Sequence, residues 1–174
     1  MGKRPGTAKK WLKERVRLSD VVVEDFRLEI SDQGVKESVF FNAPAAGSFS
    51  GDRFFFQPYV ISSFFPETAE VQPDERSKAF YLNPNIFSFM DTDTVTWVLP
   101  DGFEVENAPK DVRLEAPFGY YESRLESREP GQLRYSRKVQ IKGGLYPAEV
   151  YKQWVDFVRA VNRADRQRTV LRKM

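Results

Sequence analysis

Two pairs of acidic residues have the spacing at which strand side chains share one face: Asp91 with Asp93, and Glu104 with Glu106. Such a pair could supply oxygen ligands to a hard cation such as Ca²⁺, or the two carboxylates of a glycosidase. Neither pair is followed by the glycine and the distal glutamate of an EF-hand loop, and no feature selects one pair as acid and base. The sequence therefore predicts neither a metal site nor a glycosidase centre.

Composition limits the remaining catalytic chemistry. The 174 residues include no cysteine and no histidine. Their absence excludes Cys–His and Ser–His nucleophilic centres, disulfides, and thiolate or imidazole metal ligands. A Ser–Lys pair stays formally open, although no motif marks one, and Gly143-Gly144 lacks the glycine spacing of a phosphate-binding loop. We expect no catalytic residue, no cofactor and no bound metal.

A group of aromatic residues in the first half of the chain could form an interaction surface. Its members are Phe54, Phe55, Phe56, Tyr59, Phe64 and Phe65. Sugar-binding platforms favour Trp and Tyr, whereas enrichment in Phe favours a hydrophobic core or a protein interface. A core is our main interpretation, and a groove for a glycan or a peptide is the alternative.

Charge is concentrated at the two ends of the chain. Residues 1–16 and residues 159–174 each carry a net charge of +5, whereas residues 17–158 carry −8. Basic ends could meet nucleic acid or anionic lipid, but solvated surfaces are the simpler interpretation. No run reaches the roughly 18 apolar residues of a membrane span, and the N-terminus lacks the apolar stretch of a signal peptide. We expect no membrane insertion, no signal peptide within this chain and no nucleic-acid partner.

The N-terminal part is expected to contain a short helix and a hairpin. Residues 8–16 have the apolar spacing of a helix. Residues 22–30 alternate as in a half-buried strand, which predicts Val22 and Phe26 on one face. A turn at 32–34 then leads to an antiparallel partner strand.

Strand patterns return in the C-terminal half, after a stretch at 43–90 that shows no clean period. In the pattern at residues 133–142 the apolar residues share one face, which Arg137 interrupts. The five patterns lie at residues 93–100, 103–109, 118–127, 133–142 and 168–173.

One helix is expected at about 146–165. Pro147 suits its first turn, where the missing N–H is not needed. Tyr151, Trp154 and Val158 follow at helical spacing and form an apolar stripe, so we interpret them as structural residues that close a core. With six or more antiparallel strands, this helix predicts a mainly β fold: an antiparallel β-sandwich with the helix packed on the sheet.

Four stretches, in order, resemble the C-terminal domain of bacterial transglutaminase-like proteins, particularly those of Bacteroidetes. The resemblance covers about residues 16–173, with a looser match over 61–94, and YPAEVY is its most specific piece. The stretches are VEDFRLEI (23–30), GDRFFFQPYV (51–60), WVLPDGFEVENAPKDVRLEAPFGYYES (97–123) and GGLYPAEVYKQWVDFVRAVNRADRQRTVLRK (143–173).

The resemblance implies a role without catalysis. In that family a β-rich domain and a transglutaminase-like core precede this C-terminal domain, and the Cys–His–Asp centre lies in the core. The implied organisation is a basic linker or helical tail at 1–16 and one accessory β-sandwich domain at 17–174. Its implied partner is the adjacent core domain or another protein, and the implied location is periplasmic or at the cell surface. A stand-alone binding module that uses the aromatic residues of 54–65 is the alternative.

Overall fold

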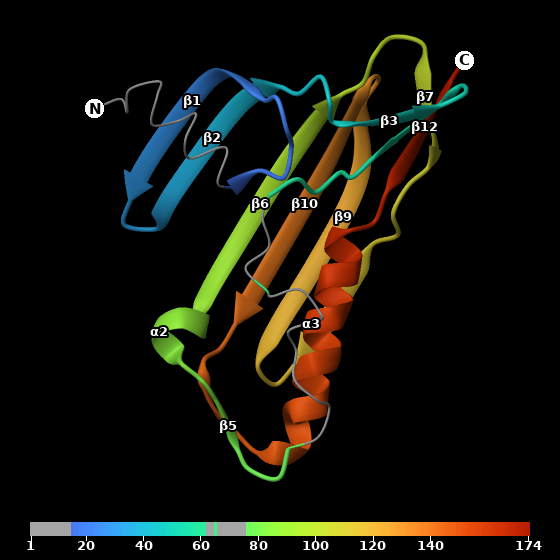
Figure 1. Cartoon of the computed structure of the whole chain (residues 1–174). Coiled ribbons are helices and arrows are strands. Elements are labelled where there is room, and N and C mark those ends of the chain that lie inside the picture. Colours follow the sequence, from blue (N-terminus) through green and yellow to red (C-terminus); the bar gives the residue numbers. More distant parts are fainter. Residues whose placement is uncertain (1–14, 62–64, 66–75) are drawn as a thin grey trace. The chain divides into compact units, whose positions relative to one another are not determined.

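The computed structural model describes residues 15–61, 65 and 76–174. The chain forms two compact units, one made of Met1–Ser48 with Val60–Ser62 and the other of Phe49–Tyr59 with Ser63–Met174. Strands dominate the described residues (Figure 1). None of the helices described there is both long and apolar enough to cross a membrane.

The first unit contains a hairpin of β1 (Val22–Ser31) and β2 (Gly34–Asn42), as the sequence predicts. A bulge between Val23 and Asp25 changes the predicted faces, because it inserts one residue into β1. Val23 lies opposite Phe41, so Val23 and not Val22 shares a face with Phe26. The expected helix at 8–16 lies almost wholly outside the described residues.

The main sheet of the second unit is antiparallel, in the order β6-β10-β9-β8. The inward residues of β10 are all buried, including Arg137, which confirms the predicted alternation of this strand. The sequence patterns did not identify β8, a five-residue strand between Pro109 and Pro117. The strands are β6 (Phe89–Val98), β8 (Val112–Ala116), β9 (Gly119–Glu129) and β10 (Gln132–Ile141).

A second sheet, in the order β3-β4-β12-β7, packs on one part of the main sheet. Phe56 and Leu171 from this sheet form a small core with Leu133 of β10. Its β3 falls in the stretch at 43–90, in which the sequence shows no clean period. The strands are β3 (Gly47–Ser50), β4 (Arg53–Phe56), β7 (Phe103–Asn107) and β12 (Thr169–Lys173).

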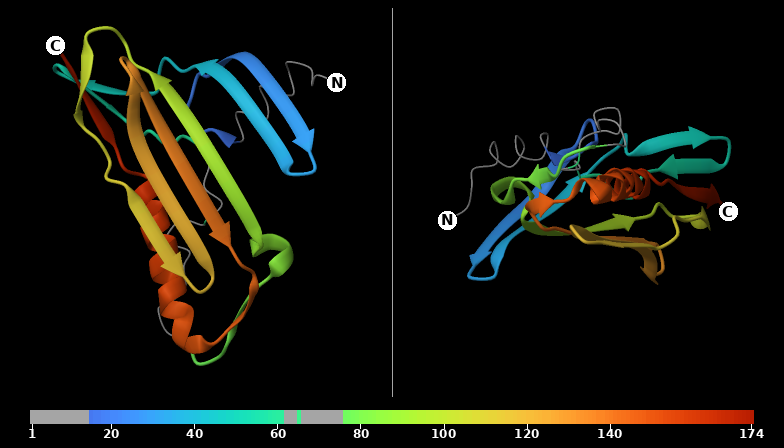
Figure 2. Two further views of the ribbon diagram at one scale, coloured as in Figure 1. Left: turned by 180° about the vertical axis from the view of Figure 1, so that it is seen from behind. Right: turned by 90° about the horizontal axis from the view of Figure 1, so that it is seen from below.

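The remaining part of the main sheet is covered by a helix. After a single 3-10 turn η2 (Ala148–Val150), α3 runs over Tyr151–Asp165 (Figure 1). The views from behind and below show it along one face of the sheet (Figure 2). Pro147 lies one residue before η2 in an extended conformation, so it starts the helical segment from just outside it. The mainly β fold with a C-terminal helix on the sheet is therefore confirmed.

The connection into α3 depends on close backbone packing. The segment passes through a two-stranded sheet of β5 (Phe80–Leu82) and β11 (Gly144–Tyr146), with a helical turn α2 (Pro84–Phe87) after β5. A Cβ at Gly143 would lie 2.4 Å from Cα of Pro84, whereas one at Gly144 would meet nothing closer than 3.7 Å. Gly143 is thus required by contact, and not as part of a phosphate loop.

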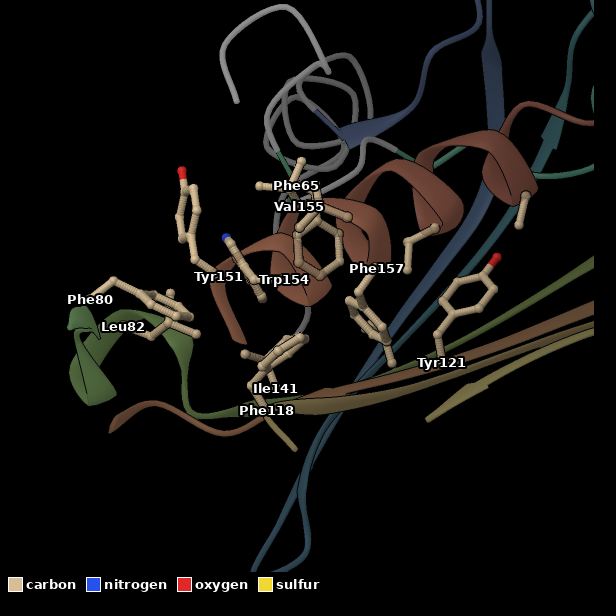
Figure 3. Packing of buried hydrophobic residues seen from close by; sticks show 14 residues of the cluster. Phe65, Phe80, Leu82, Phe118, Tyr121, Ile141, Tyr151, Trp154, Val155 and Phe157 are labelled. Carbon is tan, nitrogen blue, oxygen red and sulfur yellow. The ribbon is translucent and has the colours of Figure 1, made fainter. Parts of the chain in front are cut away.

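The main hydrophobic core lies between α3 and the sheet. Tyr151 and Val158 are buried there, and Trp154 is 9% exposed. The ring of Trp154 meets that of Phe118 edge to face at 5.2 Å, and Phe118 points at the helix from the sheet side (Figure 3). The apolar stripe of the sequence is therefore the face that packs on the sheet.

We predict that Trp154→Ala lowers the free energy of unfolding by about 3–5 kcal/mol, because it removes a buried aromatic ring and leaves a cavity. Urea denaturation followed by circular dichroism measures the loss. Lys152→Ala, on the exposed side of the same helix, is the control and should change stability by less than about 0.5 kcal/mol. A loss below about 1 kcal/mol for Trp154→Ala would show that the helix is not packed as described.

Candidate functional site

The most concentrated polar chemistry in the described residues is a cluster around Arg137, at an inward position of β10. We call it the arginine cluster. Its guanidinium is 1% exposed, although the flanking inward residues Tyr135 and Val139 belong to the core. A charge in such a place needs partners, because an unpaired buried ion is very costly. The cluster consists of Arg137, Asp93, Asp165, Tyr59 and Tyr121.

Two carboxylates from distant parts of the chain pair with the guanidinium. Arg137 Nε donates to Asp165 Oδ1 at 3.0 Å, and Arg137 Nη1 donates to Asp93 Oδ2 at 3.2 Å. Asp165 is the last residue of α3, and Asp93 lies in the middle of β6 on the strand next to Arg137. The ion pairs thus join the end of the helix to two strands of the sheet.

Two tyrosines complete the arginine cluster. Tyr121 Oη on β9 donates to Asp165 Oδ1 at 2.7 Å, and Tyr59 Oη donates to Asp93 Oδ2 at 3.0 Å. The guanidinium carbon of Arg137 lies 4.8 Å from the ring centre of Tyr59 and 5.5 Å from that of Tyr121. Both rings therefore add cation–π attraction to the hydrogen bonds of their hydroxyl groups.

Two further hydrogen bonds hold the segment that carries Tyr59, one through a side chain and one through the backbone. Gln57 Nε2 donates to the carbonyl oxygen of Asp165 at 2.6 Å, and Trp97 Nε1 donates to that of Pro58 at 2.9 Å. These two bonds fix the chain after β4 against the end of α3 and against β6. Tyr59 itself is only 2% exposed.

The charges and protons of the arginine cluster are fixed by burial and by its neighbours. Burial lowers the pKa of Arg137, whereas Asp165, Tyr59 and Asp93 raise it. Their combined effect is larger than that of burial, so the pKa of Arg137 lies above its ordinary value. Burial also raises the pKa of Tyr59 and of Tyr121 far above the ordinary value for a phenol. The guanidinium therefore stays charged and both phenols stay protonated at neutral pH.

The carboxyl group of Asp93 has a raised pKa. Burial raises the pKa of its carboxyl above the ordinary value of 3.8, and the nearby charge of Asp91 raises it further. The Arg137 guanidinium and the Tyr59 hydroxyl act in the opposite direction without cancelling this effect.

This arrangement favours a structural role over catalysis. A general base must reach the proton that it abstracts, and a guanidinium that keeps its proton cannot act as one. Asp165 is 1% exposed and Asp93 is 11% exposed, and both already accept hydrogen bonds from within the chain. The arginine cluster therefore joins β6, β9, β10, α3 and the segment after β4 from inside.

The acidic pairs singled out in the sequence have different surroundings. Asp91 and Asp93 do lie on one face of β6, but Asp93 belongs to the arginine cluster and Asp91 is exposed. Glu106 forms a bidentate pair with Arg53, at 2.5 and 2.7 Å, while Glu104 is exposed. Among the described residues, no group of three or more acidic side chains is placed to hold a metal ion.

The aromatic residues of 54–65 separate into three places. Phe54 and Phe56 stack on each other in the small core, where Phe56 also meets Trp97, and Phe55 points to the other face of β4. Tyr59 lies in the arginine cluster, and Phe65 packs against Trp154 of α3 (Figure 3). Phe64 lies outside the described residues. Phe56, Tyr59 and Phe65 are each at most 5% exposed, and Phe54 and Phe55 are half-buried.

We predict that Arg137→Met destabilises the protein by about 3–5 kcal/mol, because it leaves two buried carboxylates without their cation. Urea denaturation measures the loss. Arg134→Met changes an exposed position on the same strand and is the matched control, with an effect within about 0.5 kcal/mol.

A second substitution tests whether the loss comes from the ion pair. Adding Asp165→Asn to Arg137→Met should cost less than the sum of the two single losses, with a coupling of about 0.5–3 kcal/mol. Strict additivity would contradict the pairing described here.

A further prediction concerns pH. The folded state binds the Asp93 proton more tightly than the unfolded state does, so the stability linked to that proton is lost as pH rises through the folded pKa. The difference in unfolding free energy between the wild type and Asp93→Asn should therefore fall as pH rises from about 4 towards neutrality. Urea denaturation at a series of pH values measures it. A difference that grows with pH would contradict the raised pKa.

Comparison with known proteins identifies a similar fold and a family. The fold resembles a crystal structure of a putative protease from Parabacteroides distasonis ATCC 8503, with a TM-score of 0.54 at 13% sequence identity. The likeness covers 71% of this chain but only 24% of that protein. No curated protein matches the sequence. A family model of a domain of unknown function with a solved structure, DUF3858, matches residues 52–171, so the chain belongs to the DUF3858 family.

Proposed function

We propose that this chain is a non-catalytic accessory domain of a longer transglutaminase-like protein of the papain-like superfamily, and that it packs against or caps the catalytic core of that protein. The observation that carries the proposal is the burial of the arginine cluster. Its carboxylates, guanidinium and phenols are the most concentrated polar groups of the described residues, and each group makes at least one hydrogen bond to another member of the cluster. The periplasm or the cell surface is the proposed location, on the resemblance alone.

The structural neighbour supports the idea of a larger protein. The chain spans about a quarter of the length of that protein, which is named for a protease activity. A region of this fold therefore occurs within a much longer chain, whose remaining residues have room for a catalytic centre. The absence of cysteine and histidine from the present sequence agrees with a catalytic centre located elsewhere.

The alternative, a stand-alone module that binds a glycan or a peptide through residues 54–65, has less support. Phe56, Tyr59 and Phe65 have little exposed surface for a ligand to contact. They contribute instead to the small core, the arginine cluster and the main core.

The test uses the coding sequence that adjoins this one in its genome. We expect it to encode a transglutaminase-like core with a Cys–His pair, and that core, produced separately, should bind the present chain in isothermal titration calorimetry. The core should be active towards amide substrates, whereas the present chain should show no turnover. Turnover by the present chain, or failure of an encoded core to bind it, would contradict the proposal.

A further inference from the structure

The main sheet ends at one side in a long strand, β6. β6 has ten residues and pairs along its whole length with β10, without a register shift. Among the described residues no strand pairs with its other edge. Half of its backbone N–H and C=O groups therefore point away from the sheet, as in any edge strand.

The other edges in this unit are protected in ways that β6 is not. β8 has five residues and lies between Pro109 and Pro117, while β3 has only four. β7 also has only five residues. Short length and proline both discourage an edge strand from pairing with another chain. β6 carries two aspartates, Asp91 and Asp93, but it is long, regular and free of proline, so its edge is suited to pairing in a register that keeps these carboxylates apart.

The outward face of β6 also has a composition that suits a partner strand. Three threonines alternate along it, Thr92, Thr94 and Thr96, and all are exposed. At the two ends of this row, Met90 is 63% exposed and Val98 is 69% exposed. Threonine and valine are strong strand formers, and cross-strand Thr–Thr and apolar pairs stabilise antiparallel sheets.

We propose that β6 pairs antiparallel with β6 of a second copy of this chain, across a two-fold axis at Thr94, so that two four-stranded sheets become one of eight strands. This register sets Thr94 opposite the partner's Thr94 and Thr92 opposite the partner's Thr96. It also sets Met90 opposite the partner's Val98, so that each exposed apolar end is covered by the other. The inference does not depend on the accessory role.

Charge selects this register over its neighbours. In any alternative register the inward side chains of both copies must stay on the same face of the joined sheet. The two-fold axis must therefore pass through a residue of β6, and the alternatives place it at residues other than Thr94. An axis at Asp93 would set that carboxylate opposite itself, and an axis at Thr92 would set Asp91 opposite the partner's Asp93; both oppose like charges. An axis at Val95 would oppose no charges, but it would leave Met90 beyond the partner's strand, opposite the partner's Pro100. Only the axis at Thr94 avoids like charges and pairs both apolar ends.

The first experiment measures the oligomeric state of the full chain by sedimentation velocity over a range of concentrations. We expect a monomer–dimer equilibrium for the wild type and loss of the dimer for Thr94→Lys, which sets two lysines against each other. Ser136→Lys is the matched control, because Ser136 lies beside Thr94 on the same face of the sheet but on the central strand β10. The control should dimerise like the wild type. Mixing Thr94→Lys with Thr94→Glu should restore the dimer, which excludes misfolding as the cause of its loss.

The second experiment maps the register by disulfide crosslinking, since the chain has no cysteine of its own. Directly opposed side chains have Cβ atoms about 4.5–5.5 Å apart, close to disulfide reach. Thr94→Cys should therefore crosslink to itself under mild oxidation. Thr92→Cys alone and Thr96→Cys alone should not, because equal positions would be about 13 Å apart. A mixture of these two variants should crosslink.

Three outcomes would overturn the inference. One is a wild-type monomer at every concentration, and another is a dimer that Thr94→Lys leaves intact. The third is self-crosslinking of Thr92→Cys or Thr96→Cys in place of Thr94→Cys, which would show another register. A monomer whose β6 amides become protected from hydrogen exchange only when a different protein is added would assign the edge to that protein.

Discussion

The buried guanidinium of Arg137 sets a condition that the rest of the second unit must meet. A charge placed among core residues costs several kcal/mol unless carboxylates and hydrogen bonds compensate it. Here one carboxylate comes from the end of α3 and the other from β6. Arg137 can therefore be buried with both partners only when α3 extends to Asp165 and β6 pairs with β10 in the register that sets Asp93 opposite Arg137. Apolar packing alone would be less selective, since hydrophobic contacts tolerate shifts that an ion pair does not.

Local patterns in the sequence predicted the parts of this arrangement that depend on neighbouring residues. The alternation of β10 placed Arg137 on the inward face, and the spacing of Tyr151, Trp154 and Val158 predicted the packed face of α3. The partners of Arg137 could not be predicted in the same way. Asp93 and Asp165 lie 44 and 28 positions away in the chain, and no local period relates them to it. A charged residue within an apolar face was nevertheless a signal that a buried partner must exist.

Other differences have equally local causes. The alternation of 22–30 predicted the hairpin but not its faces, because a single inserted residue at the bulge exchanges Val22 for Val23. β8 was missed because a five-residue strand between two prolines shows too few alternations. The aromatic residues of 54–65 could not be assigned to one surface, because they separate after β4. Phe56 lies in the small core, Tyr59 in the arginine cluster and Phe65 in the main core. Composition predicted their burial better than any period did.

The arginine cluster also bears on the edge of the sheet. An inward-pointing charge on an edge strand normally discourages pairing with another chain, because the pairing would bury it. Asp93 is such a residue by position, but Arg137 and Tyr59 already satisfy it within its own chain. Its charge is thus compensated within its own chain, so it opposes a partner strand only in a register that sets it opposite another carboxylate. The exposed face of β6 presents threonines. The ion pair that fixes the inside of the sheet therefore leaves its longest edge able to pair.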